Sequence, residues 1–98
     1  MTVIFEMVPP VCEALGLGKG VAFVREFAAD GETVAVALDR AVAAEPRLAD
    51  KVYYPKAGVF SRDYHLILNG NFVDVNAGGL ARSLKDGDRL VVVPGASG

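Results

Sequence analysis

The chain has 98 residues, of which 52% are hydrophobic and 22% are charged, and its formal net charge is −2. This length fits one domain with a single hydrophobic core, and the composition excludes a disordered chain. The basic residues are scattered, so we expect no nucleic-acid partner, and the apolar runs are too short to span a membrane. The N-terminus lacks the basic region of a signal peptide, and the single cysteine, Cys12, favours a reducing compartment, the cytoplasm.

Two strands are predicted near the N-terminus. Residues 2–8 alternate between apolar and polar positions with period two, and Pro9-Pro10 end this pattern. A glycine-rich stretch over residues 16–20 marks a loop, and residues 21–27 form a second strand candidate. We therefore expect the two strands to pair as a hairpin.

The segment between Thr33 and Pro46 predicts the clearest helix. The Thr33 hydroxyl suits an N-cap, and Pro46 is a stop signal. The apolar residues between them form one stripe with helical spacing. This stripe is expected to pack on the first and last strands, with Val34, Leu38, Ala41 and Val42 contacting Val3, Phe5, Leu90 and Val92.

The second half of the chain predicts short elements separated by turns. We expect a long ordered loop over residues 47–63, with Leu48 and some of Tyr53, Tyr54 and Phe60 tucked onto the core. The elements expected after it are a strand at 64–68, a turn at 69–71, a short strand at 72–75, one helical turn at 78–84 that buries Leu80 and Leu84, a turn at 85–88, and a last strand at 89–93.

This order of elements indicates an α+β fold with a mixed sheet of four to five strands packed on one main helix. The first and last strands can pair in parallel at the centre of the sheet. The order is that of the β-grasp fold, which is the fold of ubiquitin. We assign residues 1–94 to this domain and residues 95–98 to a flexible C-terminal tail.

Three stretches give the sequence a resemblance to the MoaD/ThiS family of ubiquitin-like sulfur carriers. The segment ETVAVALDRAVAAEPRL is similar to the family's threonine-capped helix followed by a proline and a leucine. The segment HLILNGNFVDVNAGGLARSLKDGDRLVVVP contains LKDGDRLVVVP, which resembles the family pattern of a DGD turn, a strand and a proline. The third stretch is the tail, in which small residues lead to a glycine. The family usually ends in Gly-Gly, whereas here Ser97 precedes Gly98, so either Ser97 replaces a glycine or one glycine is missing.

The resemblance implies a carrier protein rather than an enzyme. A MoeB/ThiF-type enzyme would use ATP to adenylate the carboxylate of Gly98, and sulfur would then convert it to a thiocarboxylate for a sulfur-accepting synthase. The recipient pathway would be molybdopterin, thiamine, cysteine or tungsten-cofactor biosynthesis. No cofactor is expected on this chain, since residues 16–20 do not match a phosphate loop. The slim arm that enters the enzyme would be Pro94, Gly95, Ala96 and Ser97, and the four residues after the proline span about 13 Å when extended.

A docking surface for the partner is expected on the sheet face that points away from the helix. Val91 and Val93 alternate with the inward residues of the last strand, and Ile4 does so on the first strand. We expect these three residues to lie together at the root of the tail as an apolar patch.

Two other functions remain open, of which only the first uses the same tail chemistry. A ubiquitin-like modifier would join its activated Gly98 to a lysine of a target protein, and a non-carrier β-grasp subunit would use only its sheet surface. Among the other features, His65 alone makes no metal site, and the DGD sequence at 86–88 is interpreted as a turn.

Overall fold

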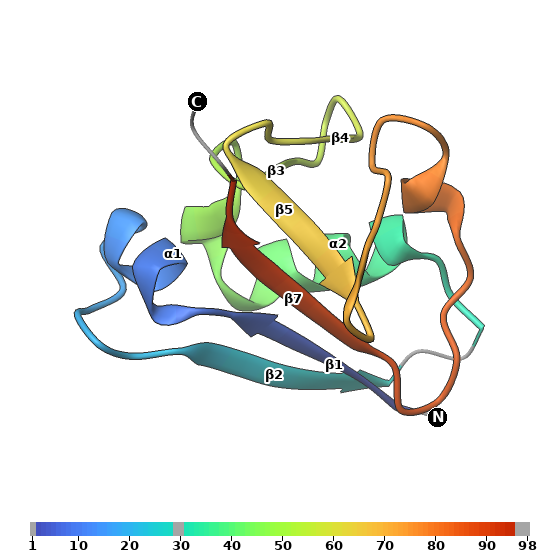
Figure 1. The fold of residues 1–98 in the computed structure, drawn as a ribbon, viewed down its shortest axis with the longest axis horizontal. Coiled ribbons are helices and arrows are strands. Elements are labelled where there is room, and N and C mark those ends of the chain that lie inside the picture. The colour runs from blue at the N-terminus through green and yellow to red at the C-terminus, as the bar shows by residue number, and fades with distance from the viewer. Residues whose placement is uncertain (1, 29–30, 96–98) are drawn as a thin grey trace.

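The fold is a five-stranded mixed sheet with one main helix packed across one face (Figure 1). A computed structural model describes residues 2–28 and 31–95. The helix α2 spans Val34–Ala44, and the strands follow the order β2-β1-β7-β5-β6 across the sheet. Their bounds are Thr2–Met7 for β1, Phe23–Ala28 for β2, Tyr64–Leu68 for β5, Asn71–Phe72 for β6 and Arg89–Pro94 for β7. The expected α+β arrangement is therefore confirmed.

Strand β7 lies in the middle of the sheet because it pairs on both sides. It runs parallel to β1, with Phe5 opposite Leu90, and antiparallel to β5, with Leu66 opposite Val92. Strand β2 pairs with β1 in antiparallel orientation. The parallel pairing of the first and last strands, expected from the sequence, is confirmed.

The core forms between the inner face of the sheet and the apolar stripe of α2. The helix begins where expected, because the Thr33 hydroxyl accepts a hydrogen bond from the Val36 amide at 3.3 Å. All but one of the residues predicted for this contact are buried, namely Val3, Phe5, Val34, Leu38, Ala41, Leu90 and Val92. Val42 is only half-buried at the edge of the same cluster.

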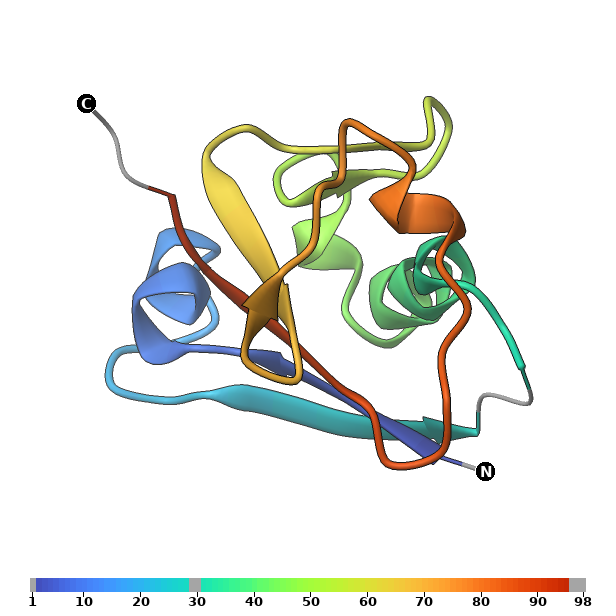
Figure 2. The same cartoon turned by 45° about the vertical axis from the view of Figure 1, so that its right-hand side comes forward.

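A short helix, α1, follows β1 directly and was not predicted. It spans Pro9–Ala14 and lies beside β7 (Figure 2), and its Val11 and Cys12 are buried. The two prolines were interpreted only as the end of the strand. Proline also suits the first turn of a helix, where the backbone N–H has no partner within the helix. The strands β1 and β2 do form an antiparallel pair, but this helix belongs to their connection.

The segment predicted as a long loop contains regular structure of its own. A 3-10 turn, η1, covers Pro46–Leu48, and a two-stranded sheet joins β3, Tyr53–Tyr54, to β4, Val59–Phe60. The expected anchoring of this segment is confirmed, because Leu48, Tyr53 and Phe60 are buried in the core.

Two predicted elements before β7 are shorter than expected. Strand β6 ends at Phe72, so residues 73–75 are not part of it. The helical turn is a 3-10 turn, η2, over Gly79–Ala81. Leu84 is buried outside this turn while Leu80 is half-buried, so they do not form the expected helical pair.

The turn before β7 is held by the carboxylates of Asp86 and Asp88. The Asp88 carboxylate accepts hydrogen bonds from the Lys85 amide at 2.7 Å and from the Asn69 side chain at 2.8 Å. The Asp86 carboxylate accepts a hydrogen bond from the Thr2 amide at 2.7 Å. Burial alone raises the pKa of Asp88, but the hydrogen bonds from Lys85 and Asn69 and the positive charges of Lys85 and Arg82 together lower it below the usual value. The DGD sequence therefore fixes the point at which β7 enters the sheet.

Replacing Leu38 by Ala should lower the free energy of unfolding by ~2–5 kcal/mol, because Leu38 is fully buried between α2 and the sheet. The matched control is Val36→Ala on the same helix, where the side chain is 36% exposed and the loss should stay below about 1 kcal/mol. Denaturation in urea measures both values. Equal losses for the two variants would contradict the packing described here.

Asp88→Asn should lower the free energy of unfolding at pH 7 by roughly 1 kcal/mol, because the carboxylate accepts two hydrogen bonds at the turn. A carboxyl group with a lowered pKa stabilises the folded state above its unfolded pKa and loses this effect as the pH falls through the folded pKa. The difference between wild type and variant should therefore shrink on acidification. Thermal unfolding across the acidic range measures it, with Asp39→Asn on the exposed side of α2 as the control.

Candidate functional site: the outer sheet face and the root of the tail

The sheet face that points away from α2 has an apolar patch beside the end of β7. The strand register places His65 opposite Val93, Ile67 opposite Val91, and Phe72 opposite Ile67. Residues directly opposite one another share a face. We call these five residues, His65, Ile67, Phe72, Val91 and Val93, the outer patch.

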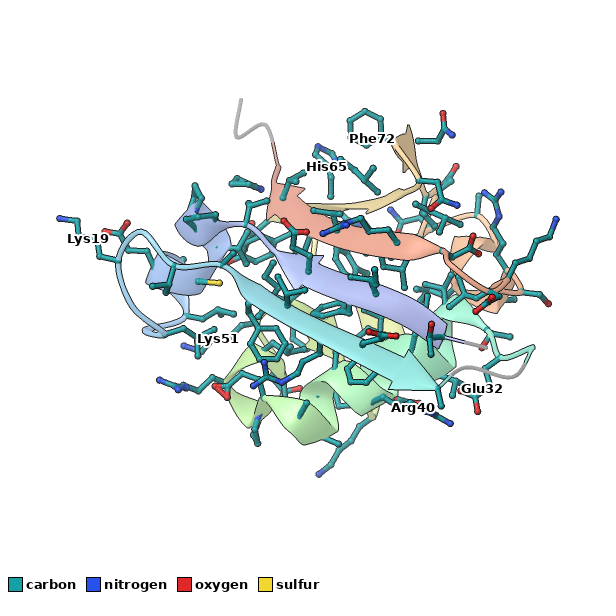
Figure 3. The ribbon with its side chains drawn as sticks, turned by 90° about the horizontal axis from the view of Figure 1, so that it is seen from below. Lys19, Glu32, Arg40, Lys51, His65 and Phe72 are labelled. Atoms are coloured by element: carbon teal, nitrogen blue, oxygen red, sulfur yellow. The ribbon has the colours of Figure 1, made fainter. Side chains whose placement is uncertain are left out.

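Phe72 is the most exposed apolar member of the outer patch, with 69% of its surface accessible. Its ring contacts the ring of His65 edge-on, with 5.2 Å between the ring centroids. Figure 3 shows both rings on the side of the sheet opposite α2. Val91 and Val93 are half-buried on this face, as their predicted outward orientation requires. An aromatic ring this exposed next to β-branched side chains is suited to contact with a partner.

Ile4 lies on the outer face, as predicted, but its predicted place at the root of the tail, beside Val93, is wrong. It lies opposite Arg89, at the start of β7, whereas the β1 residue opposite Val91 is Glu6. Glu6 and Arg89 form an ion pair at 2.6 Å on this face. Because the two strands run parallel, a residue early in β1 meets a residue early in β7, far from the tail. The outer patch instead extends toward β5 and β6.

Ile67 and Phe72 are members of the patch that the sequence interpretation missed. A signal for both was present, since residue 67 is the outward apolar position of the strand at 64–68, and Phe72 follows the Asn-Gly turn. Pairing the two arms of a tight hairpin would have placed them on one face.

The root of the tail is bound to the loop that leads into β5. Pro94 ends β7 opposite Tyr64, and the Gly95 amide donates a hydrogen bond to the Asp63 carbonyl oxygen at 2.8 Å. Gly95 was expected to belong to the flexible tail, but its backbone is held by this bond. Ala96, Ser97 and Gly98 lie outside the described residues.

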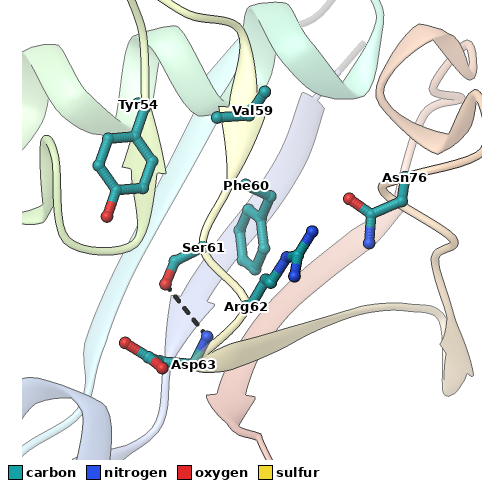
Figure 4. A pocket seen from close by; sticks show the side chains of 7 residues that line it. All are labelled: Tyr54, Val59, Phe60, Ser61, Arg62, Asp63 and Asn76. Atoms are coloured by element: carbon teal, nitrogen blue, oxygen red, sulfur yellow. Dashed lines mark hydrogen bonds between the residues drawn. The ribbon is translucent and has the colours of Figure 1, made fainter.

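An open hollow of about 410 Å³ lies beside this loop (Figure 4). Within it, the Ser61 hydroxyl accepts a hydrogen bond from the Asp63 amide at 3.1 Å. The lining combines aromatic, polar and charged side chains from three segments, namely Tyr54, Val59, Phe60, Ser61, Arg62, Asp63 and Asn76. The lining therefore includes Asp63, the residue whose carbonyl oxygen binds the Gly95 amide.

Other chemically capable groups have structural roles. The Cys12 thiol donates a hydrogen bond to the Met7 carbonyl oxygen, and burial raises its pKa, which disfavours a reactive thiolate. Among residues 2–28 and 31–95, no group of three or more histidine, cysteine or acidic residues could hold a metal ion. Within the same ranges, no helix is long and apolar enough to cross a bilayer.

Comparison with known proteins identifies the architecture. No protein-family model matches the chain, and no curated protein matches it. SAMP1 from Haloferax volcanii matches with a TM-score of 0.72 and 24% identity, over 100% of this chain and 99% of that one. The small archaeal modifier protein 1 from Methanosarcina acetivorans matches with a TM-score of 0.69 and 22% identity, over 99% and 95% of the two chains. The chain has the ubiquitin-like β-grasp fold.

A third β-grasp match comes from the Amycolatopsis orientalis BexX/CysO complex, with a TM-score of 0.58, 23% identity and 98% coverage of both chains. These matches have identities of 22–24%, so they confirm the predicted resemblance at the level of the fold. CysO was solved together with another protein, BexX.

Proposed function

We propose that this β-grasp protein is a sulfur carrier and that the carboxylate of Gly98 is its reactive group. One observation carries the proposal. The central strand β7 presents Val91 and Val93 on the outer face and then leads through Pro94 directly into the small residues before Gly98. One strand therefore joins the proposed docking surface to a slim arm. This arrangement suits a protein that a partner enzyme binds by its surface while its C-terminus enters the buried active site of that enzyme.

The proposed reaction needs an activated carboxylate, because a free carboxylate is a poor electrophile. In a MoeB/ThiF-type enzyme, a carboxylate oxygen of Gly98 would attack the α-phosphorus of ATP and release pyrophosphate. The terminal sulfur of a persulfide would then attack the carbonyl carbon and displace AMP. A thiol would finally attack the other sulfur of the acyl disulfide, which leaves a thiocarboxylate on Gly98 and a disulfide on the donor side.

The chain's own contribution is to present Gly98 in a narrow space. Glycine carries no side chain beside the reacting carbonyl, and Gly95 and Ala96 keep the arm thin. The ATP would be bound by the partner enzyme. A sulfur-accepting synthase of molybdopterin, thiamine, cysteine or tungsten-cofactor biosynthesis would then take the sulfur. The single cysteine supports a reducing compartment, so we place this chemistry in the cytoplasm.

The outer patch is the proposed docking surface for the adenylating enzyme. Its exposed Phe72 ring and the two valines of β7 would be covered by the partner, while the Glu6–Arg89 ion pair would border the contact. The structure of CysO in a complex with BexX supports the idea that a protein of this fold can bind a different protein as its partner.

A second candidate function is protein modification, because two of the similar structures are named small archaeal modifier proteins. In that case the activated Gly98 would form an isopeptide bond with a lysine of a target protein. Intact mass spectrometry of the protein isolated from cells separates the candidates. Replacement of one oxygen by sulfur supports the carrier, and adducts of higher mass support the modifier. An unmodified terminus under sulfur demand favours a non-carrier interaction subunit.

Val93→Asp should weaken binding to the adenylating enzyme at least tenfold, mainly through faster dissociation, because a charge would be buried in the contact without a partner. Val59→Asp is the matched control, since Val59 is 48% exposed on β4, outside the outer patch. Surface plasmon resonance measures the rates, and circular dichroism checks the fold. Equal dissociation rates for wild type and Val93→Asp would remove the outer patch from the interface.

Changes in tail length should alter the rate of adenylation without altering stability. Deletion of Gly98 shortens the arm by about 3.5 Å, and a misplacement of about 1 Å can cost a hundredfold in rate. If Ser97-Gly98 is the working end, one glycine appended after Gly98 should also slow the reaction. If a glycine has been lost, the extended chain should react faster. Pyrophosphate release with ATP and the enzyme measures all three chains, and equal rates for all three would contradict a role for Gly98.

A further inference from the structure

The contact between Gly95 and Asp63 joins the tail to a loop that is itself fixed to the core. We call residues 61–63 the clamp loop. The Gly95 amide donates to the Asp63 carbonyl oxygen at 2.8 Å, one residue beyond the last residue of β7. The antiparallel pairing of β5 with β7 ends with Tyr64 opposite Pro94, so this bond continues the contact of the two segments past the sheet.

Glycine is required at position 95 for steric reasons. A Cβ atom there would lie 2.9 Å from the Asp63 carbonyl oxygen, 3.1 Å from the carbonyl carbon and 3.4 Å from the Arg62 carbonyl oxygen. These are backbone atoms, so no side-chain rotation relieves the overlap. Any larger residue at position 95 must push the tail away from the clamp loop or displace the loop itself.

Two further hydrogen bonds hold the clamp loop, one within the loop and one to the core. The Asp63 amide donates to the Ser61 hydroxyl at 3.1 Å, as Figure 4 shows. The Ser61 amide donates to the carbonyl oxygen of Val52 at 2.8 Å, and Val52 is fully buried. Ser61 is itself buried, with 6% of its surface exposed. A chain of bonds thus runs from the core through Ser61 and Asp63 to Gly95.

We propose that the clamp loop sets the direction in which the tail leaves the domain, and that Gly95 is a positioning residue for activation of Gly98. This inference rests on the proposed function. With Gly95 held, the arm that reaches into the enzyme is residues 96–98, which span about 10 Å when extended, rather than about 13 Å. A shorter arm with a fixed origin has fewer orientations to lose when it enters the active site, so less binding energy is needed to align it.

The test compares four chains: wild type, Gly95→Ala, Ser61→Ala and the control Ser83→Ala. Ser61→Ala removes the hydroxyl that holds Asp63, whereas Ser83 is exposed and lies outside the clamp loop. Amide hydrogen exchange and the heteronuclear NOE at position 95 report the clamp directly. Pyrophosphate release with ATP and a MoeB/ThiF-type enzyme gives kcat and KM for each chain.

We expect the wild-type Gly95 amide to be protected and as rigid as the amides of β7. In Gly95→Ala this protection should be lost and kcat should fall about tenfold to a hundredfold, with KM changed less than about threefold because the outer patch is intact. Ser61→Ala should shift both readouts in the same direction, and Ser83→Ala should match wild type.

A freely exchanging Gly95 amide in the wild-type chain, or a wild-type kcat in Gly95→Ala, would overturn the inference. If the wild-type chain releases no pyrophosphate with any such enzyme, the proposed function fails instead. The exchange and NOE measurements at position 95 still decide whether the clamp exists in that case.

Discussion

The parallel pairing of β1 with β7 is the contact on which the rest of the molecule depends. It joins the two ends of the described chain, from the Ile4 amide bound to the Asp88 carbonyl oxygen to the Val8 amide bound to the Val92 carbonyl oxygen. Parallel strands need a long connection between them. Here that connection contains α2, which covers the inner face that the two strands create. Without this pairing, neither the core nor the position of the tail would be defined.

The same pairing places alternate residues of β7 on opposite faces of the sheet, where they have different roles. Leu90 and Val92 are fully buried against α2, whereas Val91 and Val93 lie half-buried on the outer face. The inner residues stabilise the domain and the outer ones are available for a partner. Because the period of a strand is two, the two tasks remain separate along a single short segment.

The sequence predicted what depends on local pattern. The Thr33 cap, the stripe of α2 and the alternation in β7 are all properties of neighbouring residues, and the structure confirms them. The helix α1 was missed because a pair of prolines both ends a strand and suits the first turn of a helix. Nothing local distinguishes these two outcomes.

The candidate site was predicted only in part, because its remaining features depend on contacts between distant segments. Ile4 was misplaced because the register between β1 and β7 is set by residues more than 80 positions apart, such as Thr2 and Asp86. The bond from Gly95 to Asp63 crosses between segments in the same way. Sequence pattern shows which face a residue occupies, but it does not show which residue lies beside it.

The central position of β7 has a consequence for how the protein is made. Of the strands described here, β7 comes last in the sequence, yet it joins the β1–β2 pair to the β5–β6 pair. During synthesis the ribosome therefore exposes the β1–β2 pair and α2 well before the strand that completes the sheet. Contacts between segments that are distant in the sequence form late, and proteins that depend on them fold slowly. A nascent chain of this kind completes its sheet only after residue 94 has left the exit tunnel. A chain that stops before β7 therefore cannot complete the sheet and does not reach the folded state.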